Sequence, residues 1–425
     1  MTASPLFAAY RAATVALEPA GRPFLAWRLG RGKEDAARVG ERLGHAGRPR
    51  PPGRLVWLHG ASVGEGVSLL PLIDALMARG CNILLTTGTV NSARVLAGRL
   101  PGGVIHQFAP LDLPGPVRRF LGHWRPDLAV LAESELWPNL VDGLHRAAVP
   151  LVMVNARMSE RSARRWSRAP GFIGALLGRT ALCLCQSEAD AARYRALGAA
   201  RVAVAGLLKY DVPAPAADPE AVARFTAAVG PRPVWVAAST HADEEAALFD
   251  AEAALRRDVP DVLTVVAPRQ PNRGAPLLAE AHRRGITAAL RSRGDAIHAG
   301  TAFYIADTLG ELGLWYRAAD LVFVGNSLAA PGGGQNPIEA ARLGCAVLHG
   351  PHVANFADVY PALDAAGGAA PVLDAGHLAE AVATLLGDPA RLRTMARAAA
   401  EAVEGRGGAT ARTAEALAPY LGVAA

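Results

Sequence analysis

The chain has 425 residues, 51% of them hydrophobic and 19% charged, and a formal net charge of +6. This length predicts two domains, and this composition supports large buried cores and excludes a disordered chain. The four cysteines form no CxxC pair and have no histidine at zinc-ligand spacing. We therefore expect a reducing compartment and no metal site built on cysteine.

The first element is a basic segment, residues 1–54. It holds ten Arg and Lys against four Asp and Glu, and the other 371 residues (425 − 54) balance at 34 against 34. Its apolar stretch 6–29 is interrupted by charges and by Pro19, so no clean run is long enough to span a membrane. We interpret the segment either as an amphipathic anchor on anionic lipid or as a helix packed on its own domain. No signal peptide is visible, and no basic cluster with interleaved aromatic residues predicts a nucleic-acid partner.

Short apolar runs then alternate with stretches of helical period. This alternation predicts a parallel sheet covered on both faces, an α/β fold. The predicted strands are 55–59, 82–87, 104–108, 128–132, 150–154, 182–186 and 201–204, and the predicted helices include 66–79, 90–99, 136–147 and 189–197.

The loop after the first strand reads SVGEG at 62–66. Gly60 and Gly64 allow the backbone to approach a ligand closely. Glu65 opens the next helix, and it is either a general base for a hydroxyl group or a charge that favours the helix N-terminus.

Two further loops follow strands in this half. The segment ESELWPN at 133–139 places Glu133 and Glu135 at the carboxyl edge of the sheet, and the arginine-rich segment 155–166 follows the next strand. The arginines fit phosphates or sugar carboxylates, or form a solvated basic helix.

A proline-rich connector at 212–219 interrupts the alternation, with Lys209 just before it. We predict an N-terminal segment 1–54, one α/β domain at 55–207 and a second at 208–425, whose last helices may cross back. Lys209 and Lys33 are the two lysines among 44 basic residues, so 42 are arginine.

The alternation restarts in the second half, with predicted strands at 233–237, 262–267, 303–305, 321–324 and 346–349. Acids at 243–245 suit the first turn of a helix. A glycine-rich loop, 325–335, leads to a helix start at Pro337 with Glu339 in its first turn, an arrangement typical of phosphate and ribose binding. Neither a Walker loop nor GxGxxG occurs.

Together these motifs resemble the 3-deoxy-manno-octulosonic acid (Kdo) transferases of lipopolysaccharide synthesis. The matching segments are SVGEG, ESELWPN, NARMS, GLLKYD, PRQPNR, DTLGE, GGGQNPIEA and GPHVANF, in family order along nearly the whole chain. Gln270 and Gln335 stand where the family usually has histidine, and Leu309 where it has methionine.

The resemblance implies a B-type glycosyltransferase fold, with an acceptor-binding domain at 55–207 and a donor-binding domain at 208–425. It also implies a role for each matched residue. Glu65 would be the proton acceptor, and Glu133 and Lys209 would stabilise the transition state. The CMP moiety of the donor would contact Pro268, Arg269, Leu309, Gly310, Glu311, Asn336, Pro337, Ile338 and Glu339.

The implied reaction is inverting transfer of Kdo from CMP-Kdo to the lipid A precursor lipid IVA, on the cytoplasmic side of the inner membrane. No acidic metal-binding motif is evident, so we expect neither a metal nor another cofactor. The alternatives are another nucleotide-sugar enzyme of the same fold, such as a UDP-sugar 2-epimerase, and a non-enzymatic two-lobed binding protein.

Overall fold

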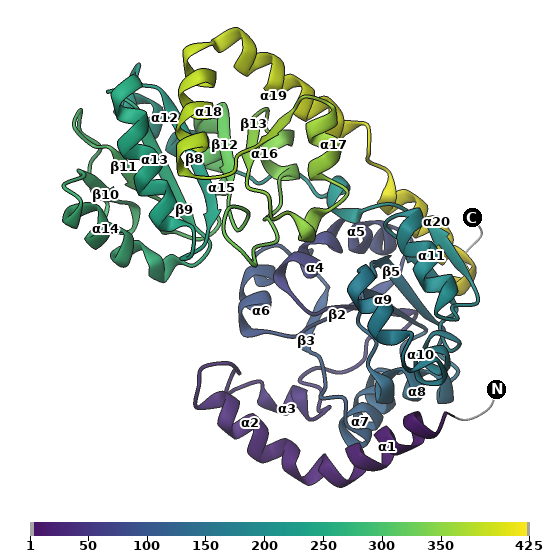
Figure 1. The fold of residues 1–425 in the computed structure, drawn as a ribbon. Helices are drawn as coiled ribbons and strands as arrows, with labels where there is room; N and C mark the ends of the chain where they lie inside the picture. Colours follow the sequence, from purple (N-terminus) through teal and green to yellow (C-terminus); the bar gives the residue numbers. More distant parts are fainter. Residues whose placement is uncertain (1–3, 423–425) are drawn as a thin grey trace. The chain divides into compact units, whose positions relative to one another are not determined.

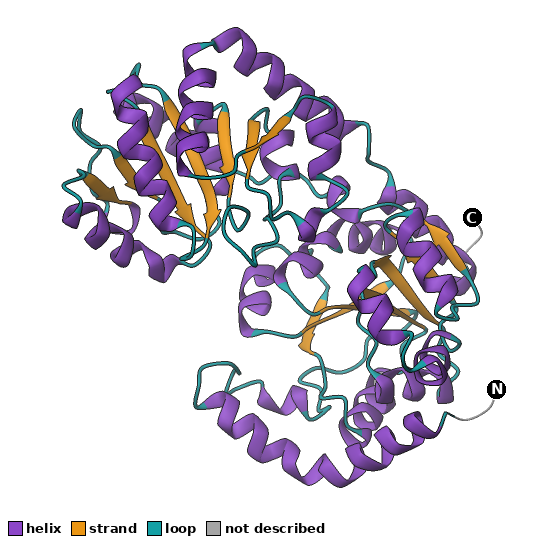
Figure 2. Cartoon of the chain, viewed as in Figure 1, coloured by secondary structure: helices purple, strands orange, loops and turns teal. Residues whose placement is uncertain are grey.

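The computed structural model describes residues 4–422 and divides into two units, each with a seven-stranded parallel sheet (Figure 1). The first unit comprises Met1–Val212 and Gly407–Ala425, and the second comprises Pro213–Arg406. The chain thus leaves the first unit after Val212 rather than after residue 207, and its last helix belongs to the first unit. In each unit helices cover both faces of the sheet, as the sequence alternation predicts (Figure 2).

The first sheet has the strand order β3-β2-β1-β4-β5-β6-β7. β1 pairs in parallel with both β2 and β4, so the strand order reverses between β1 and β4. Ligands of such sheets bind beyond the carboxyl ends of the strands at this reversal. The strands are β1 (Leu55–Gly60), β2 (Asn82–Thr87), β3 (Ile105–Phe108), β4 (Leu128–Ala132), β5 (Leu151–Ala156), β6 (Leu182–Cys185) and β7 (Val202–Val204).

One predicted helix of this unit is divided in two. The expected helix 66–79 is α4 followed by α5, because Pro71 has no N–H group to continue the hydrogen bonds of α4. The helices after β1 are α4 (Val63–Ser68), α5 (Leu70–Ala78), α6 (Val90–Ala97), α7 (Pro114–Trp124), α8 (Pro138–Arg146), α9 (Glu160–Trp166), α10 (Pro170–Leu177), α11 (Glu188–Ala196), η2 (Leu208–Asp211) and α20 (Ala409–Leu421).

The N-terminal segment forms α1 (Pro5–Leu17), η1 (Glu18–Ala20), α2 (Gly21–Leu29) and α3 (Val39–Arg42). α1 packs on α10 through Phe7, whose ring centroid lies 5.9 Å from that of Phe172. Tyr10 donates a hydrogen bond of 2.9 Å to Asp112 in the loop before α7. The segment is therefore part of the first unit.

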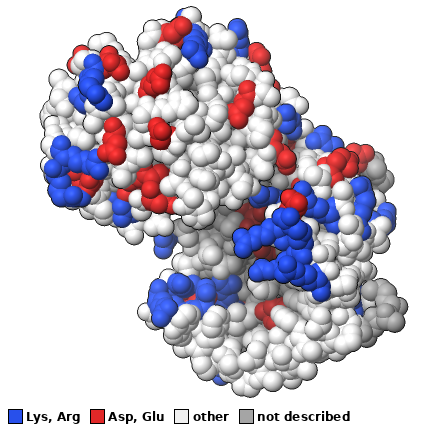
Figure 3. All heavy atoms as spheres, in the orientation of Figure 1, with Lys and Arg blue, Asp and Glu red and all other residues white. Residues whose placement is uncertain are grey.

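The outer face of this segment nevertheless carries exposed apolar side chains. They are 45–59% exposed and comprise Leu6, Val15, Leu17, Phe24 and Trp27. Arg28 lies over the ring of Phe24, and Arg31 lies 4.1 Å from the ring centroid of Trp27. Figure 3 shows basic side chains grouped near the segment that joins α2 to α3. Within residues 4–422 no helix is both long and apolar enough to cross a bilayer.

The second sheet has the order β10-β11-β9-β8-β12-β13-β14, with its reversal between β8 and β12. The sequence did not predict β10 or β14, which are three-residue edge strands; β10 is rich in alanine and β14 ends in proline. The strands are β8 (Val234–Thr240), β9 (Leu263–Pro268), β10 (Ala288–Leu290), β11 (Phe303–Ile305), β12 (Leu321–Val324), β13 (Ala346–His349) and β14 (Ala369–Pro371).

The first helix of the second unit precedes β8, and the others lie between these strands and after them. They are α12 (Pro219–Val229), α13 (Glu245–Asp258), η3 (Pro271–Arg273), α14 (Gly274–Arg283), η4 (Arg291–Arg293), α15 (Leu312–Ala318), α16 (Ile338–Arg342), η5 (Ala354–Phe356), α17 (Tyr360–Ala365), α18 (Ala375–Gly387) and α19 (Pro389–Glu404).

The returning helix α20 is built into the first unit. Its residues Leu417 and Leu421 are buried in the same apolar cluster as Val56 of β1. Asp211 of η2 accepts hydrogen bonds from the backbone N–H groups of Gly408 and Thr410 at the start of this helix. The first unit is therefore completed by the last residues of the chain.

Candidate active site

Glu65 lies beyond the carboxyl end of β1, where the strand order reverses. Ser62 caps α4 by accepting from the Glu65 N–H at 3.3 Å, and its hydroxyl donates to Glu65 Oε1 at 2.7 Å. The Ala61 N–H donates to Glu65 Oε2 at 2.8 Å. This reciprocal cap holds the carboxylate in one orientation.

Glu133 follows β4, the strand on the other side of the reversal. Its φ of 55° lies in the left-handed region, which non-glycine residues rarely adopt and which recurs at functional sites. Its N–H donates to Val154 O at 2.9 Å, and Tyr194 donates to its carbonyl oxygen at 3.4 Å. These bonds fix Glu133 where the strand ends.

Lys209 lies on η2, and its Nζ is 3.5 Å from Glu133 Oε1. The neighbouring Leu208 is buried, and its N–H donates to Asn155 Oδ1 at 3.1 Å. The first unit thus brings Lys209 and Glu133 together, and the charge of Glu133 acts on Glu65. These are three residues that the sequence nominated for catalysis.

Burial raises the pKa of Glu65. The negative charge of Glu133 raises this pKa further, and the hydrogen bonds from Ser62 and Ala61 oppose the shift. A carboxylate with a raised pKa is a stronger base once ionised, which suits proton abstraction from a hydroxyl group.

This arrangement predicts opposite pH shifts for two variants. If Glu65 is the base, activity is lost as pH falls through its pKa. Glu133→Gln removes a like charge, so the acid limb of the kcat/KM profile should move to lower pH. Ser62→Ala removes a hydrogen bond to the carboxylate, so the limb should move to higher pH. The residual kcat/KM of each variant, measured across pH, checks both shifts. An acid limb that does not move in either variant would show that another group titrates there.

His59 and Glu135 form a second polar pair at the same edge. His59 Nε2 lies 3.6 Å from Glu135 Oε2, and Trp137 Nε1 donates to the same oxygen at 2.5 Å. Burial favours the neutral acid, but the hydrogen bonds from His59 and Trp137 and the charge of His59 outweigh it and lower the pKa of Glu135. The sequence did not assign His59 a role, because its partners Thr86 and Glu135 lie in β2 and in the loop after β4.

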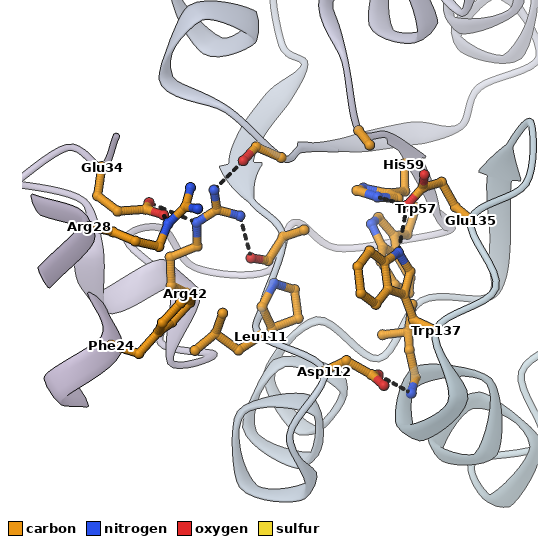
Figure 4. Close-up of a pocket in the computed structure, with 15 residues that line it drawn as sticks. Phe24, Arg28, Glu34, Arg42, Trp57, His59, Leu111, Asp112, Glu135 and Trp137 are labelled. Carbon is orange, nitrogen blue, oxygen red and sulfur yellow. Dashed lines mark hydrogen bonds and ion pairs between the residues drawn. The ribbon is translucent and has the colours of Figure 1, made fainter. Parts of the chain in front are cut away.

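A pocket of about 340 Å³ lies in the first unit next to this pair (Figure 4). One end is formed by Phe24, Arg28, Glu34 and Arg42 from the N-terminal segment. The remaining lining residues come from β1, from the loops after β1, β2, β3 and β4, and from α8: Trp57, His59, Ala61, Gly88, Ala109, Pro110, Leu111, Asp112, Glu135, Trp137 and Leu140. Ala61 also holds Glu65, so the pocket adjoins the loop of the candidate base.

The arginines that follow β5 remain on the surface. Arg161, Arg164 and Arg165 are exposed on α9, and Arg164 Nη1 lies 3.4 Å from Glu160 Oε1. Figure 3 shows a dense basic group over this part of the first unit. This exposure fits the interpretation of a solvated basic helix.

The residues nominated for CMP all lie in the second unit. Pro268 ends β9, and the Arg269 N–H donates to Thr240 O at 2.9 Å. Leu309 is exposed and Gly310 has a φ of 84°, so this tight turn places backbone at the surface. Glu311 is paired with Arg291 at 2.7 Å, and the hydrogen bond from Arg291 lowers the pKa of Glu311.

The segment after the glycine-rich loop forms the start of a short helix. Asn336 Oδ1 accepts from the Ile338 N–H at 3.1 Å, and Asn336 Nδ2 donates to Glu339 Oε1 at 3.0 Å. Pro337 is the N-cap of α16 rather than its first helical residue. The structure therefore brings these four residues to one helix terminus.

Glu244 organises the loops around this terminus, and the sequence did not identify it among the acids at 243–245. The carboxylate is 1% exposed and accepts from the N–H groups of His241, Asn326, Ser327 and Leu328 at 2.5–3.3 Å. It ties the loop after β8 to the loop after β12. A run of three acids does not reveal in the sequence which one turns inward.

Among residues 4–422, no three His, Cys, Asp or Glu side chains form a cluster that could hold a metal ion. The four cysteines are buried and unpaired.

The two doubly wound units, each with loops at its strand reversal, form the B-type glycosyltransferase fold. The fold is shared with a putative UDP-N-acetylglucosamine 2-epimerase from Listeria monocytogenes, with a TM-score of 0.61 and 14% identity over 87% of this chain and 97% of that chain. At this identity the likeness shows the fold alone.

The sequence comparisons identify the family. Residues 37–212 match the family described as 3-deoxy-D-manno-octulosonic-acid transferase (kdotransferase). The chain is 36% identical to a probable 3-deoxy-D-manno-octulosonic acid transferase, mitochondrial, of Arabidopsis thaliana, over 93% of this chain and 91% of the relative. It is 37% identical to the 3-deoxy-D-manno-octulosonic acid transferase of Bordetella pertussis, over 90% of this chain and 91% of that relative. The chain belongs to the Kdo transferase family, which confirms the resemblance seen in its motifs and makes it an enzyme.

Proposed function

We propose that this Kdo transferase uses CMP-Kdo as its donor and the tetraacyl disaccharide lipid IVA as its acceptor. The observation that carries this proposal is the grouping of Glu65, Glu133 and Lys209 around the strand reversal of the first unit. A base, a second carboxylate and a compact ammonium are the groups that hydroxyl attack on a sugar ester requires.

The proposed reaction is a single inverting displacement. The acceptor hydroxyl attacks the anomeric carbon of Kdo as the bond from that carbon to the phosphate oxygen breaks. The hydroxyl proton passes to Glu65, and CMP leaves as a phosphate monoester anion. Glu133 and Lys209 stabilise the charges that develop on the sugar and the leaving group.

The second unit supplies the proposed donor site. Pro268 and Arg269, the turn at Leu309–Glu311 and the helix start at Asn336–Glu339 follow its strands, and Glu244 fixes two of the loops between them. Backbone N–H groups at turns and helix starts suit a nucleotide phosphate.

The direct test is incubation with CMP-Kdo and lipid IVA, followed by mass spectrometry of the lipid and measurement of released CMP. We expect lipid masses raised by one or more Kdo residues, with CMP released in equal number. Turnover of a UDP-sugar with no change in the lipid would contradict the proposal.

We also propose that the outer face of α1 and α2 binds the inner membrane from its cytoplasmic side. Exposed apolar side chains beside arginines are typical of helices that lie in a membrane interface. The double variant Leu17→Ser, Trp27→Ser should float poorly with vesicles that contain anionic phospholipid. Flotation of the unmodified protein should weaken at high salt, because salt screens exposed charges.

The matched control is Leu373→Ser, which removes a side chain that is 65% exposed in the second unit. It should float like the unmodified protein. Equal flotation of the double variant and this control would contradict the membrane face, and flotation independent of salt would contradict its electrostatic part.

A further inference from the structure

We infer that the pocket of the first unit is a binding site for one fatty acyl chain of the acceptor. This inference rests on the proposed lipid acceptor and adds a specificity site to it. Three features of the pocket carry it: charges that are already paired, an apolar wall, and a position between the exposed face of α2 and the loop of Glu65 (Figure 4).

The charged residues that the N-terminal segment contributes to the pocket form ion pairs with one another. Arg28 Nε donates to Glu34 Oε1 at 2.5 Å, and Arg42 Nε donates to Glu34 Oε2 at 3.0 Å. Arg42 also donates to the carbonyl oxygens of Ala109 and Gly88. An ionic ligand here would have to displace these contacts.

The polar groups elsewhere on the wall are also paired. Asp112 accepts from the Leu140 N–H at 2.8 Å and from the Tyr10 hydroxyl at 2.9 Å. Glu135 is held by His59 and Trp137 as described above. A sugar ring needs several hydrogen-bonding partners, and these groups are engaged with protein atoms. An apolar ligand needs none of them.

The rest of the wall is apolar. It is formed by the side chains of Phe24, Trp57, Leu111, Trp137 and Leu140, together with Pro110 and two alanines. The volume of about 340 Å³ is within the range of small-molecule sites of this kind. These surfaces suit a hydrocarbon chain.

The position of the pocket joins the proposed membrane face to the proposed base. Phe24 lines the pocket and is 45% exposed, next to the exposed Trp27 on α2. Ala61 lines it too, and its N–H holds the carboxylate of Glu65. A chain that enters from the bilayer past α2 would bring the attached sugar hydroxyl toward Glu65. A sugar without an acyl chain would not be drawn into the pocket from the bilayer.

The test is a series of disaccharide acceptors with short acyl chains that differ only in length, assayed as monomers in water below their critical micelle concentration, so that each chain leaves water when it enters the pocket. Each methylene group that the pocket buries contributes about fourfold in affinity. The kcat/KM of the unmodified enzyme should therefore rise with chain length until the pocket is full. Leu111→Trp places a larger side chain in the pocket, so the ratio of kcat/KM for long over short chains should fall at least tenfold.

Two further variants make the result decisive. Ala109→Leu fills a different part of the wall and should reduce the same ratio if Leu111→Trp does not fold. Leu373→Trp adds the same ring to the surface of the second unit and should keep the ratio of the unmodified enzyme. A Leu111→Trp or Ala109→Leu enzyme that is folded and keeps this ratio would overturn the acyl site. An unmodified enzyme that does not modify the tetraacyl acceptor at all would instead overturn the proposed function.

Discussion

Replacing Glu65 by glutamine is expected to lower kcat by about 10²–10⁴-fold, the usual contribution of a general base. Glutamine has nearly the shape of glutamate and can still accept the hydrogen bond from the Ala61 N–H, but it cannot take a proton. The measurement is kcat with CMP-Kdo and lipid IVA. Titration calorimetry with CMP should give the affinity of the unmodified enzyme, since the residues proposed to bind CMP lie in the second unit.

The stability of the Glu65→Gln variant distinguishes a catalytic role of Glu65 from a purely structural one. The folded pKa of Glu65 is raised, so the folded state binds its proton more tightly than the unfolded state does. Its contribution to stability therefore falls as pH rises from the unfolded pKa through the folded one, and ionised Glu65 costs stability at neutral pH. Glu65→Gln removes that cost, so its Tm at pH 7 should be equal to or above that of the unmodified enzyme.

Ser62→Ala is the matched control. It weakens the same helix cap, at a cost of about 1 kcal/mol, but keeps the carboxylate. If Glu65 served only to cap α4, the two variants would lose stability and activity together. A Glu65→Gln enzyme with more than a few per cent of normal kcat would place the base elsewhere.

Lys209→Arg is expected to lower kcat by roughly 10²-fold although the charge is retained. Lys209 Nζ lies 3.5 Å from Glu133 Oε1, and η2 is fixed by buried Leu208 and by the bonds of Asp211 to the start of α20. A planar guanidinium on this fixed backbone would form a two-pronged pair with Glu133 in place of the ammonium contact. The fold should be unaffected, and the Tm should change little.

The composition of the chain provides the control for this variant. Arginine occupies 42 of the 44 basic positions, so it serves for nearly every cation. Lys33 is exposed in the loop between α2 and α3, and Lys33→Arg should keep normal kcat. Equal kcat values for the two variants would show that Lys209 needs only its charge, or has no catalytic role.

Most of the fold could be predicted from the sequence because parallel strands buried on both faces are continuous apolar runs. Each predicted strand has a counterpart in the two sheets. β10 and β14 escaped prediction because they are short edge strands held by pairing with one neighbour, β11 and β13, rather than by their own composition.

The grouping of Glu65 with Glu133 could be expected, since each follows a strand at the reversal of the sheet. The pocket could not be predicted, because its wall combines α2 with the ends of strands that are far away in the sequence. The same holds for Glu34, whose two arginine partners meet it only after α2 and α3 pack on the first sheet. Hydrophobic periodicity identifies a buried face but not its partner.

The return of α20 to the first unit has a consequence for the order in which the newly made chain folds. Residues 213–406 form a continuous stretch, so the second unit has all its residues once position 406 has left the ribosome. The first unit contains earlier residues, up to Val212, but it lacks Leu417 and Leu421, which fill its apolar cluster, until residues 213–406 have been made. Domains commonly fold in the order of their synthesis, starting at the N-terminus. In this chain the unit that carries Glu65 is completed after the second unit, so a ribosome-bound chain without α20 holds all residues of the second unit but an unfinished first unit.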